Sequence, residues 1–335
     1  MNFDNKDLVR EIETIEPSAF NLLALRVFRY QAYHNPLYKY YLSLLKVEPQ
    51  MIDSIESIPF LPISFFKTHQ VKSAMVDQDV TTNSITFSSS GTMGQTTSQH
   101  HVKDLRFYLR NTQRGFEYFY GKVEDYCILG LLPSYLERQG SSLIAMVDYF
   151  VQCSRYTQSG FFLYNHDELA ERLLQNTASH IPTILIGVSF ALLDFAEQYP
   201  INLKDVIIME TGGMKGRRKE LTRTELHTKL QKAFNVSTIH SEYGMTEMLS
   251  QAYSKGAGLF YPTPTLKVLA REITDPFTIQ KCGRIGALNI IDLANLDSCA
   301  FIATDDLGSV YQDGSFEILG RLDNSDIRGC NLLII

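Results

Sequence analysis

Four short segments of the sequence contain residue types that can bind a nucleotide and its phosphates. The first runs from residue 88 to residue 98 and reads SSSGTMGQTTS. Glycines let backbone amides approach a phosphate closely, and the hydroxyl groups add hydrogen-bond donors. The segment is not a Walker A loop, because Gln95 stands where that motif requires a lysine. A Ser/Gly surface turn has the same composition, so this segment alone leaves both interpretations open.

The second segment, SEYGMTE at 241–247, follows the apolar run VSTIH. Parallel sheets bind ligands at the carboxyl ends of their strands, which is where this segment is expected to lie. A carboxylate such as that of Glu247 can bind Mg²⁺, a hard cation that prefers oxygen ligands. The alternative is a glycine turn that opens a helix, with Glu247 as a first-turn acid favoured by the helix dipole.

The third and fourth segments are ATDDLG at 303–308 and GRLDNSDIRGC at 320–330. Asp305 and Asp306 could accept hydrogen bonds from a ribose diol, although Asp and Gly are also common in ordinary hairpin turns. Arg321 could contact a phosphate or a ribose, and the alternative is a surface ion pair with Asp323. Each segment is weak evidence by itself.

Two further patterns predict no chemistry of their own. His100 and His101 are adjacent, so in a strand their side chains point to opposite faces and cannot form a metal pair. Ser189 in GVSFA lacks the second glycine of a hydrolase nucleophile elbow, because Ala191 stands in its place. We interpret Ser189 as a residue of a strand-to-helix turn that lines the ligand pocket.

The elements that must position these segments follow from hydrophobic periodicity. Residues 5–45 have the spacing of helices, and the Pro-rich stretch 57–71 is expected to be extended. From residue 126 onward, strands alternate with helices, which favours βαβ units and a largely parallel sheet. After residue 260 the pattern changes to short strands separated by turns, which indicates an antiparallel meander. Strands are predicted at 126–132, 182–190, 205–210 and 236–244, and helices at 104–121, 141–152, 167–179, 191–199 and 217–234.

Composition excludes several classes of protein. The chain has 335 residues, 44% of them apolar and 20% charged, so a packed core is expected rather than disorder. A net charge of −6 disfavours a nucleic-acid-binding protein. No apolar run is long enough for a signal peptide or a membrane span, so we expect a cytoplasmic protein. The 5 cysteines are widely spaced and form no CxxC pair, which disfavours a disulfide framework and a structural zinc site.

Taken together, the four segments are far more specific than any one of them. Their order (SSSGTMG, YGMTE, TDDLG, GRLD) resembles that of the core motifs of the adenylate-forming superfamily. Within that superfamily, LPISFFK at 61–67, LPSYLER at 132–138, GVSF at 187–190 and RGC at 328–330 resemble the acyl-protein synthetase (LuxE) family. This resemblance covers roughly residues 15–335. Phenylacetate–CoA ligase is a more distant relative.

The resemblance implies a set of site residues. The residues implied to cradle the phosphates of ATP are Ser88, Ser89, Ser90, Gly91, Thr92 and Gly94. Those implied at the nucleoside and the α-phosphate are Gly212, Gly213, Tyr243, Gly244, Thr246, Asp306 and Arg321, with Asp305 as the alternative to Asp306. Glu247 is the implied Mg²⁺ ligand, and His100 is a candidate for the acyl site. Cys330 is the implied acyl acceptor.

The resemblance also implies a fold and a reaction. The fold is α/β, with mixed, largely parallel sheets flanked by helices and a C-terminal antiparallel β portion. Residues 1–260 would form the acyl-adenylate-forming core, and 261–335 a β-rich subdomain ending near the hinge position, Asp323. The mobile lid domain that follows the hinge in full-length relatives is expected to be absent or vestigial.

The implied reaction is ATP- and Mg²⁺-dependent activation of a carboxylic acid, in particular a fatty acid, to an acyl-adenylate. Transfer to the Cys330 thiol follows, for delivery to a partner such as an acyl reductase or a carrier protein. Two alternatives remain open: an acyl- or aryl-CoA ligase of the phenylacetate–CoA ligase type, and a non-catalytic nucleotide- or acyl-binding relative.

Overall fold

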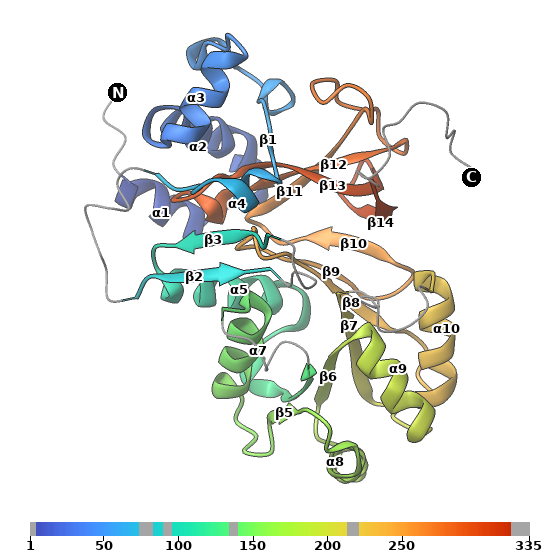
Figure 1. The fold of residues 1–335 in the computed structure, drawn as a ribbon. Helices are drawn as coiled ribbons and strands as arrows, with labels where there is room; N and C mark the ends of the chain where they lie inside the picture. Colours follow the sequence, from blue (N-terminus) through green and yellow to red (C-terminus); the bar gives the residue numbers. More distant parts are fainter. Residues whose placement is uncertain (1–4, 74–82, 90–95, 134–139, 213–220, 323–335) are drawn as a thin grey trace.

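The computed structural model describes residues 5–73, 83–89, 96–133, 140–212 and 221–322. Several short 3₁₀ helices supplement its α-helices and strands (Figure 1). The α-helices are α1 (Asn5–Glu13), α2 (Phe20–His34), α3 (Pro36–Leu44), α4 (Phe65–Thr68), α5 (Leu105–Tyr120), α7 (Ser142–Cys153), α8 (His166–Ala178), α9 (Ser189–Gln198) and α10 (Arg223–Phe234). The strands are β1 (Leu61–Pro62), β2 (Ile85–Ser88), β3 (Gln99–Val102), β4 (Cys127–Leu131), β5 (Gly160–Phe162), β6 (Thr183–Val188), β7 (Val206–Thr211), β8 (His240–Tyr243), β9 (Ala252–Ser254), β10 (Leu259–Pro262), β11 (Leu266–Arg271), β12 (Ile285–Asp292), β13 (Phe301–Val310) and β14 (Phe316–Arg321).

Most strands of the described residues belong to one mixed sheet. Its order is β11-β12-β13-β14-β10-β9-β8-β7-β6-β4-β5, and β1 adds to it by pairing with β13. The strands from β4 to β8 are parallel, whereas those from β8 through β9, β10 and β14 to β11 are antiparallel. Strands β2 and β3 form a separate antiparallel hairpin. The predicted fold class is therefore confirmed.

The parallel strands form where the sequence has continuous apolar runs. All residues of β4 and β6 are buried, as expected for strands covered on both faces. In Figure 1 the helices α7, α8, α9 and α10 surround these strands in the lower part of the molecule. Their apolar faces and the strands form one hydrophobic core, which also takes in α5. No helix in the described part of the chain is both long and apolar enough to cross a membrane.

A second hydrophobic core joins the N-terminal helices to the C-terminal strands. Helices α1, α2 and α3 pack against the antiparallel strands β11, β12 and β13, in the upper part of Figure 1. The buried side chain of Gln31 on α2 donates to the carbonyls of Asn295 (2.7 Å) and Leu296 (2.9 Å), and accepts from the amide of Ala300 (2.9 Å). The N-terminal helices thus support strands that lie far away in sequence. The division of the chain near residue 260 stays a prediction.

Two predicted elements differ from the structure. Residues 217–220 of the helix predicted over 217–234 lie outside the described part of the chain, and the described helix α10 begins at Arg223. Thr222 caps it: its hydroxyl accepts from the amide of Glu225, and the Glu225 carboxylate accepts from the amide of Thr222. The stretch 57–71, predicted as extended, contains the short helix α4 after the two residues of β1. Pro62 precedes this helix, so its missing amide removes no helical hydrogen bond.

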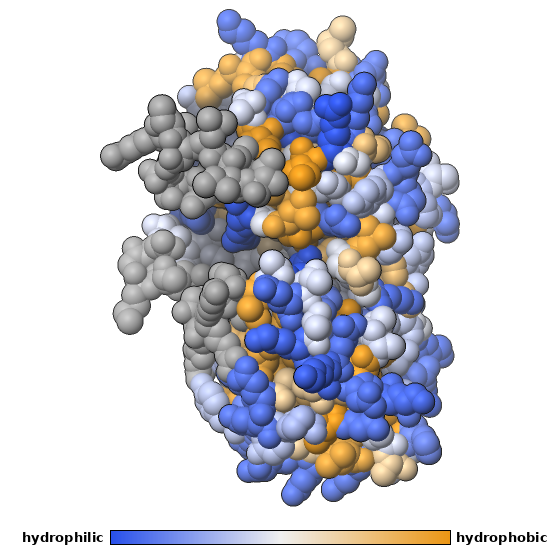
Figure 2. All heavy atoms as spheres, turned by 90° about the vertical axis from the view of Figure 1, so that its right-hand side faces the viewer, coloured by the Kyte–Doolittle hydropathy of each residue, from blue (hydrophilic) through white to orange (hydrophobic). Residues whose placement is uncertain are grey.

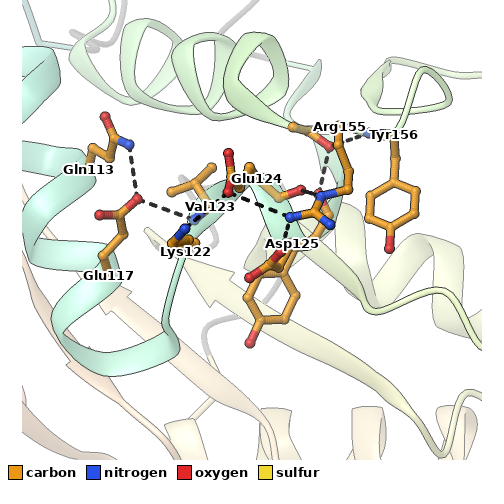
Figure 3. A network of polar contacts seen from close by, with 10 residues as sticks. Gln113, Glu117, Lys122, Val123, Glu124, Asp125, Arg155 and Tyr156 are labelled. Atoms are coloured by element: carbon orange, nitrogen blue, oxygen red, sulfur yellow. Dashed lines mark hydrogen bonds and ion pairs between the residues drawn. The ribbon is translucent and has the colours of Figure 1, made fainter.

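A surface network ties the turn after α5 to the turn after α7 (Figure 3). Arg155 donates to the Glu124 carbonyl at 3.1 Å and forms an ion pair with Asp125, while Lys122 lies 3.4 Å from the Glu124 carboxylate. All four side chains are about half-exposed or more, so solvent and salt screen these pairs. The network lies directly before β4 and contributes little stability.

Candidate active site

Three of the predicted site residues form one hydrogen-bonded chain. Tyr243, the last residue of β8, donates its hydroxyl to Asp306 Oδ2 at 2.8 Å. Arg321, the last residue of β14, donates from Nε to Asp306 Oδ1 at 2.8 Å. Asp306 and Arg321 are opposite one another in the β13–β14 pairing, which explains their proximity. The Asp306 carboxylate raises the pKa of Arg321, although burial acts in the opposite direction.

The ring of Tyr243 is held in place by apolar packing. It lies against Phe260 and Phe316, with ring centroids 6.0 Å and 5.6 Å away. Burial raises the pKa of its hydroxyl well above the usual value, and the Asp306 carboxylate adds to this effect, so Tyr243 remains a hydrogen-bond donor at neutral pH. Between the two candidate aspartates, it is Asp306 that joins Tyr243 and Arg321.

Glu247 lies in the irregular segment that follows β8. Its side chain is buried, and burial raises the pKa of its carboxyl. A hydrogen bond from Ser98 and the positive charges of Arg321 and Lys67 act against this rise. Three segments that are distant in sequence therefore direct donors or positive charge toward one carboxyl group.

Thr246 precedes Glu247 and is held through its backbone. Its carbonyl lies 2.7 Å from Nδ1 of His100, which is fully buried on β3. Burial lowers the pKa of His100 to about 4, so the ring is neutral at pH 7 and, facing a carbonyl, carries its proton on Nδ1. His101 faces the other way and contacts the hydroxyl of Thr86 at 2.8 Å, as the alternation of a strand predicts.

The ends of the hydroxyl- and glycine-rich segment converge at the hairpin of β2 and β3. The amide of Ser89 donates to the Ser98 carbonyl at 3.1 Å, and the Ser89 hydroxyl accepts from the Ser98 amide at 2.9 Å. The amide of Ser88 donates to the carbonyl of Gly140 at 2.8 Å. Ser98 thus connects this hairpin to Glu247. Six predicted site residues lie outside the described part of the chain, namely Ser90, Gly91, Thr92, Gly94, Gly213 and Cys330.

The turn after β7 places Gly212 next to Ser189. Gly212 has φ +67°, a left-handed conformation that favours glycine, and its carbonyl accepts from the Ser189 hydroxyl at 2.9 Å. Ser189 is the first residue of α9, directly after β6. This agrees with its interpretation as a residue of a strand-to-helix turn.

Two buried glutamates beside these turns were not predicted. Glu210 on β7 accepts from Ser189 Oγ (3.2 Å) and Arg223 Nε (3.3 Å), and lies 3.5 Å from His227 Nε2. Burial would raise the pKa of Glu210, but His227, Arg223 and Ser241 outweigh it and the pKa falls. The sequence feature that could have identified Glu210 is its position at the carboxyl end of a predicted parallel strand.

Glu242 lies on the opposite face of the sheet from its strand neighbour Ser241. Its Oε2 accepts from the Thr211 hydroxyl at 2.5 Å. Burial raises its pKa to about 7; the Thr211 hydrogen bond opposes the rise and the charge of Glu210 adds to it. A Cβ on Gly244 would lie 2.6 Å from Glu242 Oε1, so a larger residue at this position would require the Glu242 carboxyl to shift.

The site lies where the two hydrophobic cores meet. Tyr243 ends the parallel strand β8 and Glu247 follows it, whereas Asp306 and Arg321 belong to antiparallel strands. Figure 2 shows the molecular surface hollowed between its upper and lower parts, on the side where β14 and α10 lie in Figure 1. Within the described residues, no three His, Cys, Asp or Glu side chains gather closely enough to hold a metal ion by themselves.

The fold of the protein is similar to that of solved acyl-CoA ligases and related ligases. An open conformation of 2-hydroxyisobutyryl-CoA ligase, in complex with 2-HIB-AMP and CoA, superimposes with a TM-score of 0.65 at 15% identity, covering 97% of this chain and 80% of that one. ATP-bound MatB from Rhodopseudomonas palustris superimposes with a TM-score of 0.53 at 15% identity over 70% of this chain. The chain spans 47% of the length of the MatB structure. At these identities the likeness concerns the fold.

The family is defined by sequence. The family described as acyl-protein synthetase, LuxE, matches residues 12–335, and the chain belongs to this family. No curated protein matches the chain.

Proposed function

We propose that the protein is an enzyme that activates a carboxylic acid with ATP, forming an acyl-adenylate and pyrophosphate. The observation that carries this proposal is the chain of Tyr243, Asp306 and Arg321 beside the buried Glu247. It combines an aromatic ring, a ribose acceptor, a cation for phosphate and a carboxylate in one place. Membership of the acyl-protein synthetase family supports the same reaction.

The nucleotide would bind across the junction of the two cores. Each oxygen of the Asp306 carboxylate accepts one hydrogen bond in the structure and retains a lone pair for a ribose hydroxyl. The Arg321 side chain is 73% exposed while its Nε is anchored on Asp306, so its terminal nitrogens would face a phosphate. Gly212 and the ring of Tyr243 would border the base.

Glu247 would hold a magnesium ion together with the phosphates of ATP. Mg²⁺ is commonly bound through one or two carboxylates plus substrate phosphates, so a single buried carboxylate fits it. When bound, the ion neutralises charge on the phosphates. Thr246 would donate its hydroxyl to the α-phosphate, and Ser88 and Ser89 would donate to the terminal phosphates.

The chemistry needs positioning more than covalent catalysis. A carboxylate oxygen of the acid attacks the α-phosphorus of ATP, and the bond from that phosphorus to the β-phosphate bridging oxygen breaks. Pyrophosphate carries away the negative charge that develops, while donors and cations held in place stabilise it. A thiolate then attacks the acyl carbon, so a thioester forms and AMP leaves.

The acceptor thiol is proposed to be that of Cys330, followed by transfer to a protein partner such as an acyl reductase or a carrier. The family description supports a protein acceptor. Replacing Cys330 with Ser should abolish hydroxylamine-sensitive acyl labelling while adenylate formation survives. Unchanged labelling would exclude Cys330. The acid is proposed to be a fatty acid, and formation of acyl-CoA on addition of CoA would favour a CoA ligase instead.

Carboxylate-dependent exchange of labelled pyrophosphate into ATP tests the reaction. We expect exchange with at least one acid in a panel of alkyl and aryl carboxylates. Asp306→Asn should lower it about 10- to 100-fold, since removing one charge-assisted hydrogen bond costs roughly 1.5–3 kcal/mol. Asp305→Asn is the matched control and should retain activity. Absence of exchange across the panel, despite ATP binding, would support a non-catalytic binding protein.

A further inference from the structure

The segment that carries Glu247 is irregular, and side chains from a distant part of the chain bond its backbone. It connects β8 to β9 without regular structure. Asp292, the last residue of β12, accepts at Oδ2 from the amides of Leu249 (2.6 Å) and Ser250 (3.1 Å). Its Oδ1 accepts from the Ser250 hydroxyl at 2.6 Å. One carboxylate therefore binds two consecutive backbone amides near the end of the segment.

Asn295 bonds the same segment at Glu247 itself. Its Nδ2 donates to the Glu247 carbonyl at 2.8 Å and to Asp292 Oδ2 at 3.3 Å. Asp292 is the N-cap of the 3₁₀ helix η6 (Leu293–Asn295) and Asn295 is its last residue, and Asp292 Oδ1 also accepts from the amide of Ala294 at 3.2 Å. The hydrogen bonds within this turn therefore fix the Asp292 and Asn295 side chains relative to one another, independently of their bonds to the segment.

Both side chains are fully buried. A buried carboxylate is costly unless it is hydrogen-bonded, and an apolar side chain would fill this space at lower cost. Apolar residues, however, could not form hydrogen bonds with the backbone of residues 247–250, as Asp292 and Asn295 do. The strand that precedes Glu247 cannot anchor it through a sheet ladder, because β8 ends at Tyr243.

We propose that Asp292 and Asn295 are positioning residues that hold the backbone of Glu247 in place for a divalent cation bound to ATP. The inference rests on the proposed function, because it takes Glu247 as the cation ligand. Asp292 and Asn295 act through the Glu247 backbone and touch neither the cation nor the nucleotide. Partners that orient a metal ligand typically change metal affinity or activity 10- to 100-fold when they are removed.

Calorimetric titration of the full chain with ATP, without any acid, tests this role. Each titration is made in MgCl₂ and in EDTA, and the ratio of the two affinities measures the magnesium gain. Asp292→Asn replaces one acceptor oxygen by an amide that faces other donors, and Asn295→Ala deletes the bond to the Glu247 carbonyl. We expect both variants to lose about 10- to 100-fold of the magnesium gain and to keep their affinity for ATP in EDTA.

Asp297→Asn is the matched control. Asp297 is a partly buried carboxyl, close in sequence, but it accepts from Asn5 Nδ2 at 3.0 Å, and its variant should keep the magnesium gain. If Asp292→Asn does not fold, Asn295→Ala decides, because it leaves the Asp292 bonds to Leu249 and Ser250 intact. The positioning role alone would be overturned if the folded variants kept the full magnesium gain, or if their affinity for ATP fell equally in MgCl₂ and in EDTA. Wild-type protein that binds ATP in neither buffer would overturn the proposed function as well.

Discussion

Replacing Glu242 with Gln should remove one defined contribution to the pH dependence of stability. The pKa of Glu242 rises from 4.5 to about 7, chiefly because the carboxyl is buried. The folded chain therefore binds this proton more tightly than the unfolded chain. The protonated carboxyl therefore contributes to the free energy of unfolding. This contribution is fully present below the unfolded pKa of 4.5 and is lost as the pH rises through 7. At about 1.4 kcal/mol for each pKa unit, the loss is roughly 3 kcal/mol.

The glutamine introduced by Glu242→Gln would keep an acceptor for the Thr211 hydroxyl but cannot ionise. Between pH 4.5 and pH 8, we expect the free energy of unfolding of wild type to fall by about 3 kcal/mol relative to that of the variant. Urea denaturation at several pH values between these limits measures the difference. Glu124→Gln, at an exposed site, should follow wild type throughout. If the curves of wild type and Glu242→Gln run parallel, the carboxyl is not buried as described.

Three substitutions outside the site test the local packing. Gly308→Ala should cost at least about 2 kcal/mol in urea denaturation, because its Cβ would lie 2.0 Å from the Glu317 carbonyl of the paired strand. Gly320→Ala has no atom within 4 Å of the added Cβ and should change stability by less than about 0.5 kcal/mol. An equal loss of stability at both glycines would contradict the close backbone approach at Gly308 in the β13–β14 pair. Thr222→Ala should cost about 1 kcal/mol by breaking the capping box with Glu225; an unchanged melting temperature would mean that the cap contributes nothing.

Much of the fold could be predicted from local patterns. The apolar runs at 126–132, 182–190 and 205–210 predicted β4, β6 and β7, because strands covered on both faces need apolar residues throughout. The packing of the N-terminal helices on the C-terminal strands could not be predicted in this way. Such contacts join residues far apart in sequence, as Gln31 and Ala300 are, and periodicity carries no information on them.

The site was predictable to the extent that it depends on recognisable motifs. Tyr243, Asp306 and Arg321 were chosen from separate segments, and the register of β13 with β14 places two of them opposite one another. Asp292 and Asn295 were missed because they lie in a stretch, IIDLAN, that shows no chemical pattern. A buried polar residue is recognisable only through its partners, and here these are backbone groups of another segment.

The junction of the two cores explains why the site needs both ends of the chain. The Asp306–Arg321 pair holds a largely exposed Arg321 and therefore adds little stability, so its main effect is to orient the guanidinium. Asp306 itself is fixed by β13, which pairs with β1 and is supported by α2. Loosening the N-terminal helices should accordingly displace Asp306 and Asp292 relative to Tyr243 and Glu247, because the strands that carry the two aspartates rest on those helices.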